Sequence, residues 1–454
     1  MPRALITGIT GQDGLYLGEF LAAKGYEVFG MVRGQSNPKI PTVEECVPSI
    51  QLLEGDLRDL SSLLGVLETA QPDEIYNLGA ISFVGLSFKQ PELTGDITGM
   101  GVVRMLEAIR IHTQGTMNGV RFYQASSSEM FGTVPESPQS ETTQFHPRSP
   151  YGAAKVFGHY VTQNYRESYD AWACSGILFN HESPRRGFEF VTRKVTRAVA
   201  RIALGRQKVL AVGNMDVSRD WGFAGDYVQA MWLMLQQEKP EDYVVATGES
   251  HSVRDLLQTA FHHVGIDDWR PYVVQDERFF RPADIAVLVG DATKAHTKLD
   301  WHPTVDFQQL IKMMVAADLE NERLAACSYR NKSAASRRNP SRGGPLDEAF
   351  RDRLRSPGCG PRGLHGRYRT RGSRRRYRRG QDGDAELGQA WFREPGLDEM
   401  LSRNVAAGRL RSLPAARRLY ELRAQGARRL PNRESQMTEF GTGRRGWQPC
   451  GSLS

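Results

Sequence analysis

Two short stretches of the sequence carry side chains suited to acid–base chemistry. The first, residues 120–132, begins as an apolar, β-prone run and ends in polar residues that include Ser127 and Glu129. The second opens a helix after a proline, and its Tyr151 and Lys155 are four residues apart, so they share one helix face. A tyrosine beside an ammonium group is expected to ionise well below its ordinary pKa of about 10. The pattern therefore predicts an acid–base cluster.

Each member of this cluster also has an ordinary structural interpretation. Glu129 could cap the next turn or form a salt bridge, and Tyr151 with Lys155 could be an exposed pair on a helix. A cofactor site beside the cluster would favour the catalytic interpretation, and the N-terminal pattern predicts such a site.

The N-terminus has the pattern of a dinucleotide site. A strand at 4–7 runs into Gly8-Ile-Thr-Gly-Gln-Asp-Gly14, a helix follows to residue 24, and a second strand spans 26–32. Glycines at such a turn let the backbone approach a pyrophosphate, which lies on the helix N-terminus. The alternative is an ordinary glycine-rich turn. Arg33 follows the second strand where NAD sites usually place Asp or Glu, so the sequence favours NADP, with a solvated arginine as the alternative.

The rest of residues 1–325 alternates between strand and helix patterns, which predicts an α/β fold on a doubly wound parallel sheet. Further strands are expected at 51–54, 74–82, 120–129, 175–180, 208–213, 243–248 and 286–290, and helices at 98–111, 151–169, 191–204, 226–238, 253–264 and 307–324. Asp56, in the turn after the third strand, is expected to meet an adenine edge or to cap the next helix.

The composition limits the class of protein. At 454 residues the chain has room for up to three domains or one large α/β unit. Its five cysteines are scattered with no CxxC pair, which suits a reducing compartment and predicts neither a metal site nor a disulfide scaffold. The first residues have no signal-peptide layout, and no apolar run approaches the ~20 residues of a membrane span. We expect a cytoplasmic protein without a membrane partner.

Charge is spread unevenly along the chain. Residues 330–454 hold 28 Arg, one Lys and 12 Asp or Glu, a net charge of +17, whereas residues 1–329 carry −10. The segment 326–454 is rich in Arg, Gly and Pro, and it is interpreted as a nucleic-acid-binding arm, a disordered tail or GC-rich DNA translated out of frame. The last is favoured because base-stacking aromatic residues are sparse there, so a nucleic-acid partner is not expected.

Residues 1 to about 325 resemble the GDP-mannose 4,6-dehydratases, a family of extended short-chain dehydrogenases/reductases. The resemblance is carried by the stretches 8–14 (GITGQDG), 123–132 (YQASSSEMFG), 147–155 (PRSPYGAAK), 178–187 (LFNHESPRRG), 189–194 (EFVTRK), 219–226 (RDWGFAGD) and 243–248 (YVVATG). It implies a Rossmann domain, mainly residues 1–180, and a smaller mixed α/β domain for a nucleotide sugar, mainly residues 181–325. It also implies a homodimer or a homotetramer.

The resemblance implies a lyase reaction that converts GDP-mannose to GDP-4-keto-6-deoxymannose and water. Hydride passes from sugar C4 to NADP while Tyr151, supported by Lys155, takes the hydroxyl proton and Ser127 polarises that hydroxyl. Glu129 removes the C5 proton and helps expel the C6 hydroxyl as water. Hydride then returns to C6, so the net redox change is zero and no metal is involved.

Two sets of binding residues follow from the family motifs. The cofactor set is Gly8, Ile9, Thr10, Gly11, Gln12, Asp13, Gly14, Arg33, Asp56, Leu57, Leu78, Gly79, Ala80, Ile81, Ser82, Lys155, His181 and Arg186. The set expected to face GDP is Asn180, Lys194, Arg219 and Arg281, in which arginines suit a pyrophosphate through bidentate contacts.

The chain departs from the family at two places. Ser127 stands where the family usually has threonine, and residues 34–41 differ from the basic, serine-rich loop that reaches a neighbour's cofactor in tetrameric relatives. The nearest alternative function is a nucleotide-sugar C4 epimerase or 4-keto reductase on the same fold, which would not need the carboxylate of Glu129. A remoter alternative is a non-enzymatic binding protein with an RNA-binding, Arg-rich tail.

Overall fold

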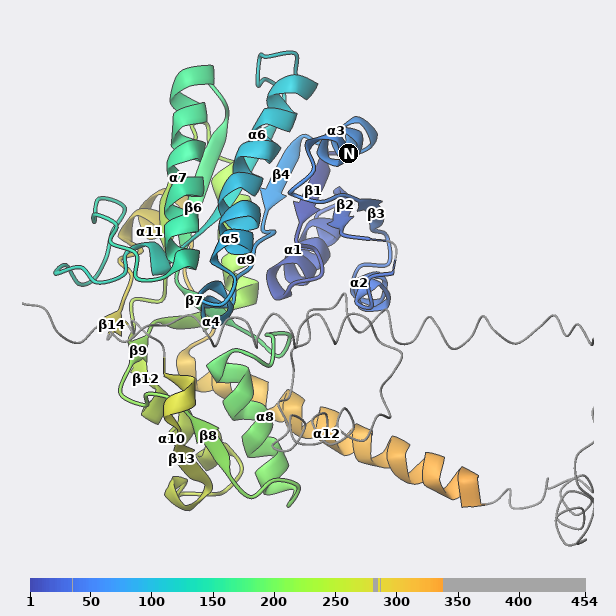
Figure 1. The fold of residues 1–454 in the computed structure, drawn as a ribbon, viewed down its shortest axis with the longest axis vertical. Coiled ribbons are helices and arrows are strands. Elements are labelled where there is room, and N and C mark those ends of the chain that lie inside the picture. Colours follow the sequence, from blue (N-terminus) through green and yellow to red (C-terminus); the bar gives the residue numbers. More distant parts are fainter. Residues whose placement is uncertain (35, 281–284, 286, 338–454) are drawn as a thin grey trace, which may run out of the picture. The chain divides into compact units, whose positions relative to one another are not determined.

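The computed structural model describes residues 1–337 except residues 35, 281–284 and 286 (Figure 1). Within them, seven strands form one all-parallel sheet in the order β11-β6-β5-β4-β1-β2-β3. The strands are β1 (Arg3–Thr7), β2 (Glu27–Val32), β3 (Gln51–Glu54), β4 (Glu74–Asn77), β5 (Arg121–Ser127), β6 (Ala173–Leu178) and β11 (Tyr243–Val245). The predicted α/β fold with a parallel, Rossmann-type sheet is confirmed.

Helices cover both faces of this sheet because the central strands are apolar on both sides. Ala4 and Ile6 of β1 belong to the core under one set of helices, and Leu5 between them belongs to the core under the other set. The first set contains α1 (Gln12–Ala23) and α9 (Ala224–Leu235). The second contains α3 (Leu60–Ala70), α6 (Gly101–His112) and α7 (Pro150–Tyr169).

A smaller group of elements has a core of its own, formed largely by α8, α10 and α12 (Figure 1). The helices are α8 (Val191–Ala203), α10 (Val253–His263) and α12 (Phe307–Arg337). The short strands are β7 (Asn180–Glu182), β8 (Leu210–Val212), β9 (Ser218–Arg219), β10 (Trp221–Phe223), β12 (His251–Ser252), β13 (Val273–Gln275) and β14 (Val287–Leu288), paired as β10-β7, β12-β9-β14 and β13-β8. The predicted mixed α/β substructure is therefore present.

Short elements fill the connections between these layers. They are α2 (Ile40–Cys46), α4 (Val84–Ser87), α5 (Pro91–Thr94), the π-helical turn η1 (Gly95–Met100), the 3-10 turns η2 (Ser128–Met130), η3 (Arg270–Tyr272) and η4 (Glu277–Phe279), and α11 (Thr293–Leu299). Among the described residues, no helix is long and apolar enough to cross a membrane. No group of three or more His, Cys, Asp or Glu in the same part of the chain is placed to hold a metal ion.

The structure also differs from the predicted bounds in several places. The strand expected over 74–82 ends at Asn77, and residues 78–83 form an irregular connection. The range 181–325, expected to hold mainly substrate elements, also supplies α9 and β11 to the large sheet. The last helix continues past Leu324 to Arg337, so the predicted tail begins as helix: this stretch lacks Gly and Pro, the residues that most oppose helix. The other predictions for residues 338–454 lie outside the described residues.

Candidate active site

The turn between β1 and α1, where the sequence predicts a pyrophosphate cradle, brings backbone segments into close contact at its glycines. Gly8 has φ +70°, and a Cβ atom there would lie 2.9 Å from the backbone nitrogen of Gly79. A Cβ atom on Gly14 would lie 2.5 Å from Cα of Ile9, so the glycine lets α1 start close against the turn. Gly11 caps α1 without a side-chain hydrogen bond to the first helical N–H groups. The cradle therefore fits an anion at the helix N-terminus.

Residues 12 and 13 tie this cradle to β7. Gln12 Nε2 donates to the carbonyl of His181 at 3.1 Å, and His181 Nε2 lies 2.9 Å from Asp13 Oδ2. Burial would raise the pKa of Asp13, but the charge and hydrogen bond of His181 lower it to about 2. Burial would lower the pKa of His181, but Asp13 raises it above its ordinary value. The pair places an imidazole and a carboxylate beside the first turn of α1.

The connection from Leu78 to Ser82 lies across the carboxyl end of β1. Thr7 Oγ1 donates to Asn77 Oδ1 at 2.7 Å and accepts from the backbone nitrogen of Gly79 at 3.0 Å. The whole connection, including Ala80 and Ile81, is partly exposed. It lies at the point where strand order reverses between β1 and β4, where open α/β sheets bind ligands.

The carboxyl ends of β2 and β3 bring Arg33 next to Asp56. The backbone nitrogen of Gly55 donates to Val32 at 2.9 Å. Hydrogen bonds from Arg58 chiefly lower the pKa of Asp56, and the charge of Arg33 adds to this. The alternative that Asp56 caps the next helix is wrong, since Asp59 is the N-cap of α3. The sequence prediction did not single out Arg58, although it stands two residues from Asp56.

The predicted catalytic residues meet where β5 ends and α7 begins. Ser127 ends β5, and its Oγ accepts a hydrogen bond from the backbone nitrogen of Glu129 at 3.3 Å. Ser149 caps α7 by accepting from the backbone nitrogen of Gly152 at 3.0 Å. A Cβ atom on Gly152 would lie 2.6 Å from the carbonyl oxygen of Glu129, so the two turns are in close contact. Tyr151, on the first turn of α7, is thereby placed beside both strand-end residues.

The pKa of Tyr151 differs from the expectation. Burial raises it to about 12, and although a hydrogen bond with Ser127 lowers it, the charge of Glu129 adds to the rise. Lys155 Nζ donates to the carbonyl of Ala125 at 2.5 Å and lies 5.8 Å from the centre of the tyrosine ring. Burial lowers the pKa of Lys155 to about 8. The predicted depression of the phenol pKa is wrong here, because burial outweighs the more distant ammonium.

The cluster and the cradle adjoin each other. The charge of Asp13 affects the pKa of both Tyr151 and Lys155, and the charge of Arg186 affects the pKa of Tyr151 and of Asp13. Arg186 forms an ion pair with Glu182 at 3.2 Å, and its guanidinium lies 3.6 Å from the centre of the Phe190 ring. Glu182 and Phe190 are neighbours that the sequence prediction missed, although both lie within four residues of Arg186.

The predicted substrate residues lie on the smaller group of elements. Asn180 is on β7, and the Lys194 ammonium on α8 lies 3.4 Å from the centre of the Phe279 ring. Burial lowers the pKa of Lys194. The guanidinium of buried Arg219 donates to the carbonyls of Ser218 at 2.8 Å and of Ile285 at 2.7 Å. Arg281 lies outside the described residues.

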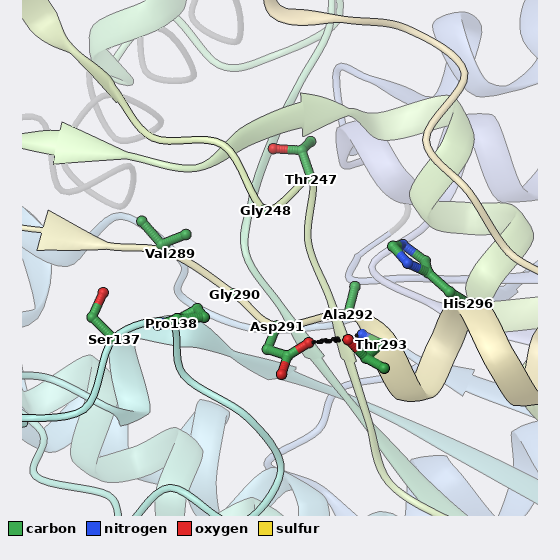
Figure 2. A pocket seen from close by; sticks show the side chains of 10 residues that line it. All are labelled: Ser137, Pro138, Thr247, Gly248, Val289, Gly290, Asp291, Ala292, Thr293 and His296. Carbon is green, nitrogen blue, oxygen red and sulfur yellow. Dashed lines mark hydrogen bonds between the residues drawn. The ribbon is translucent and has the colours of Figure 1, made fainter.

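A separate cavity of about 310 Å³ lies between the Ser137–Pro138 segment and the start of α11 (Figure 2). Figure 2 shows Asp291 hydrogen-bonded to Thr293 at its edge, and His296 also lines it. None of the predicted catalytic, cofactor or substrate residues lines this cavity. We therefore assign it no part in the chemistry.

The comparisons with known proteins agree on one family. The family model described as GDP-mannose 4,6 dehydratase matches residues 5–314. The chain is 54% identical over 325 residues to GDP-mannose 4,6 dehydratase 1 of Arabidopsis thaliana, which covers 70% of this chain and 90% of the plant protein. It is 48% identical over 341 residues to GDP-mannose 4,6 dehydratase of Homo sapiens, with 70% and 91% covered.

A solved structure supports the same fold. UDP-glucose 4-epimerase from Thermus thermophilus, in complex with NAD, has a TM-score of 0.60 and 26% identity, with 70% of this chain and 98% of that one covered. The family match spans more than half of the chain, and the two dehydratases are covered over most of their length. The chain therefore belongs to the GDP-mannose 4,6-dehydratase family.

Proposed function

We propose that this chain is a hydro-lyase that converts GDP-mannose to GDP-4-keto-6-deoxymannose and water. Family membership supports the substrate and the reaction. The observation that carries the proposal is the placement of Ser127, Glu129 and Tyr151 in one buried or half-buried cluster beside the pyrophosphate cradle. A hydroxyl, a carboxylate and a phenol are the groups that the reaction needs at the sugar.

The cofactor is a nicotinamide dinucleotide, and we propose that it is NADP. The exposed Arg33 guanidinium stands at the carboxyl end of β2, where a ribose 2′-phosphate would need a cation. Arg58, exposed and held by Asp56 at 2.8 Å, offers a second cation at the same sheet edge. The bound cofactor supplies a hydride acceptor for C4, a hydride donor for C6 and, when oxidised, a positive charge near the phenol.

At the sugar, Tyr151 takes the proton of the C4 hydroxyl and Ser127 orients that hydroxyl. With a pKa of about 12 the phenol is protonated at neutral pH, so it must lose its proton before it can act as a base. Lys155, with a pKa of about 8, remains mostly an ammonium at pH 7 and favours the phenolate by its charge. It therefore supports Tyr151 without contacting the sugar.

Glu129 is the residue that separates a dehydratase from an epimerase. Its carboxylate removes the C5 proton, which the 4-keto group has made acidic, and returns a proton to the departing C6 hydroxyl. On the nucleotide, we propose contacts from Asn180, Lys194, Arg219 and Arg281, and on the cofactor contacts from His181 and Arg186. An epimerase or a 4-keto reductase would leave C6 intact and would not depend on a carboxylate at position 129.

The test is to incubate the full chain with GDP-mannose and NADP⁺ and to identify the product by mass and NMR. We expect a product lighter by one water, carrying a C4 ketone and a C6 methyl group. Glu129→Gln keeps the side-chain shape and removes the proton-transfer group, so turnover should fall by about 10²- to 10⁴-fold. A C4 epimer with unchanged mass, or full activity in Glu129→Gln, would contradict the proposal.

We also propose that the chain works as a homo-oligomer. Large apolar side chains are exposed on η1, α6 and α7, namely Met100, Ile111, Phe157, Tyr160 and Tyr169. We propose that a second copy of the same helices covers these side chains, which a monomer leaves exposed to water. Light scattering on the purified chain should give at least twice the monomer mass, and Phe157→Glu should lower it.

A further inference from the structure

The π-helical turn η1 separates α5 from α6 and lies between two connections of the predicted cofactor site. Such turns are rare and occur mostly as single turns, frequently at functional sites. Its sequence, Gly95-Asp-Ile-Thr-Gly-Met100, was expected to be a plain helix from residue 98. The side chains of Asp96 and Thr98 each form a hydrogen bond outside the backbone ladder of the helix.

Thr98 holds the connection that follows β4. Its side chain is buried, and its Oγ1 accepts a hydrogen bond from the backbone nitrogen of Ile81 at 3.1 Å. The same connection is fixed at Gly79 by Thr7 of β1. Two threonines from different elements therefore fix residues 78–82. Because β4 lies between β1, which leads into the cradle, and β5, which ends at Ser127, we place this connection along the nicotinamide half of the cofactor.

Arg104 holds the turn that follows β3, at the other end of the predicted cofactor site. Its Nη2 donates to Asp96 Oδ1 at 2.6 Å, and its Nη1 donates to the Asp96 carbonyl at 3.1 Å and to the Leu57 carbonyl at 3.3 Å. A Cβ atom on Gly101 would lie 3.1 Å from Cβ of Leu57, so α6 starts in close contact with this turn. Leu57 is expected at the adenine end.

The π-helical turn η1 also contacts α7, the helix that carries Tyr151 and Lys155. A Cβ atom on Gly99 would lie 3.2 Å from the Phe157 ring and 3.5 Å from the carbonyl of Ala154. A Cβ atom on Gly158 would lie 3.6 Å from the carbonyl of Thr98. The glycines let η1 lie directly against α7 at Ala154, Phe157 and Gly158, the part of the helix that contains Lys155.

We infer that Thr98 and Arg104 are positioning residues for the two ends of the cofactor, both presented by η1 and the start of α6. Thr98 sets the connection beside the nicotinamide half, and Arg104 sets the turn beside the adenosine half. Neither residue touches a reacting atom. The inference rests on the proposed dinucleotide cofactor and assigns each residue to a different half of it.

Two ligands separate the two halves in a binding experiment. NADP⁺ occupies the whole site, whereas adenosine 2′,5′-bisphosphate lacks the nicotinamide half. We expect Arg104→Met to weaken both ligands by a similar factor of about five, the size of one lost hydrogen bond. We expect Thr98→Val to weaken NADP⁺ by about the same factor and to leave the bisphosphate within about twofold of the wild type. Titration calorimetry on the full chain measures the affinity of each variant for each ligand, relative to the wild type.

Control variants keep the test specific. Arg110→Met removes an arginine of the same helix whose guanidinium pairs with Glu107 at 2.8 Å, and Thr94→Val removes a hydroxyl that donates to the carbonyl of Gln90 at the start of its own helix. Neither control should change the affinity for either ligand. Thr98→Ser should restore wild-type binding. Hydrogen exchange of the peptide containing Ile81 should be faster in Thr98→Val than in Thr94→Val.

The outcomes distinguish this inference from the proposed cofactor. A wild-type chain that binds neither ligand would overturn the cofactor and the inference together. A wild-type chain that binds both, with Thr98→Val and Arg104→Met equal to it, would overturn the inference alone. Equal weakening of both ligands by both variants, in step with a common loss of thermal stability, would also overturn it, since a general structural role predicts that result.

Discussion

Ser127 differs by one methyl group from the threonine usual at its place in the family. It lies at the end of β5 with extended backbone, its Oγ accepts from the backbone nitrogen of Glu129, and it hydrogen-bonds to Tyr151. A β-branched side chain has fewer χ1 rotamers, so threonine would hold the hydroxyl in one orientation more often. We expect Ser127→Thr to raise kcat by about two- to fivefold, with KM for GDP-mannose nearly unchanged.

Steady-state kinetics with Ser127→Ala as the reference variant checks this. The alanine keeps the backbone and removes the hydroxyl, so its kcat should lie well below both hydroxyl variants. A threonine variant slower than wild type would show that the pocket around position 127 is fitted to serine.

The Asp13–His181 pair makes stability depend on pH in a definite direction. His181 has a raised pKa, so its interaction with Asp13 stabilises the fold fully below the unfolded value of about 6.5. That stabilisation is lost as pH rises through the raised pKa of the folded chain. The Asp13 carboxylate, with a pKa of about 2, stays charged throughout. We expect the Tm deficit of Asp13→Asn against wild type to be larger at pH 5.5 than at pH 9.

Thermal melts at the two pH values measure this difference. The asparagine side chain would keep a hydrogen-bonding group of the same shape, so the change isolates the charge. A deficit that is equal at both values, or larger at pH 9, would contradict a charged pair.

At the same scale, the sequence allowed the identity of the acid–base residues to be predicted but not their ionisation. The spacing of Tyr151 and Lys155 on one helix face, and the polar end of a buried strand, follow from local pattern. The pKa of Tyr151 depends on how deeply the two turns bury the phenol. It also depends on the position of the Lys155 ammonium, which donates its hydrogen bond to the carbonyl of Ala125. Those are tertiary contacts, which spacing does not specify.

Among the elements, those with a strong hydrophobic periodicity were predicted from the sequence, and those defined by long-range contacts were not. The strands of the large sheet and the amphipathic helices lie close to their expected positions. The π-helical turn at Gly95–Met100 was not predicted, because it is defined by contacts of Thr98 with Ile81, of Asp96 with Arg104 and of Gly99 with α7. Residues 175–180 were expected to form one strand, but β6 ends at Leu178 and Asn180 begins β7 in a different sheet. Apolar pattern alone does not reveal a change of pairing partner.

The start of α1 offers a test of the cradle as an element. Gly14→Ala would place Cβ 2.5 Å from Cα of Ile9, a backbone atom that cannot rotate away. We expect α1 to shift from the turn and NADP⁺ affinity to fall at least about tenfold, since the helix N-terminus would leave the pyrophosphate. Calorimetric titration measures the loss.

A matched glycine on another helix shows whether the effect is local. Gly65 lies in α3 with open space where its Cβ would be, so Gly65→Ala should leave NADP⁺ binding unchanged. It should also stabilise the fold slightly, because alanine favours helix by roughly 1 kcal/mol over glycine. Equal binding losses in both variants would mean that the cradle geometry is not what Gly14 supplies.

For the whole molecule, we expect the acidic residues 1–329 and the basic residues 330–454 to act independently. Every predicted site residue precedes residue 282, whereas the net charge of +17 lies in residues 330–454. We expect a chain ending after Arg337 to keep wild-type turnover of GDP-mannose and wild-type NADP⁺ affinity. Salt-sensitive RNA binding by the full chain, absent from the shorter one, would instead give the segment a function of its own.

The shortened chain must keep α12, because carboxylates of this helix pair with arginines of α8. Buried Arg193 of α8 pairs with Asp318 at 2.8 Å, and Glu322 faces Arg197, Arg201 and Arg206. A chain ending after Ala317 would leave the Arg193 guanidinium buried without its carboxylate, a loss of about 3–5 kcal/mol in comparable pairs. We expect that chain to aggregate or to melt far below the one ending after Arg337. If both shortened chains were equally stable, the ion pairs of Asp318 and Glu322 with α8 would not stabilise the fold.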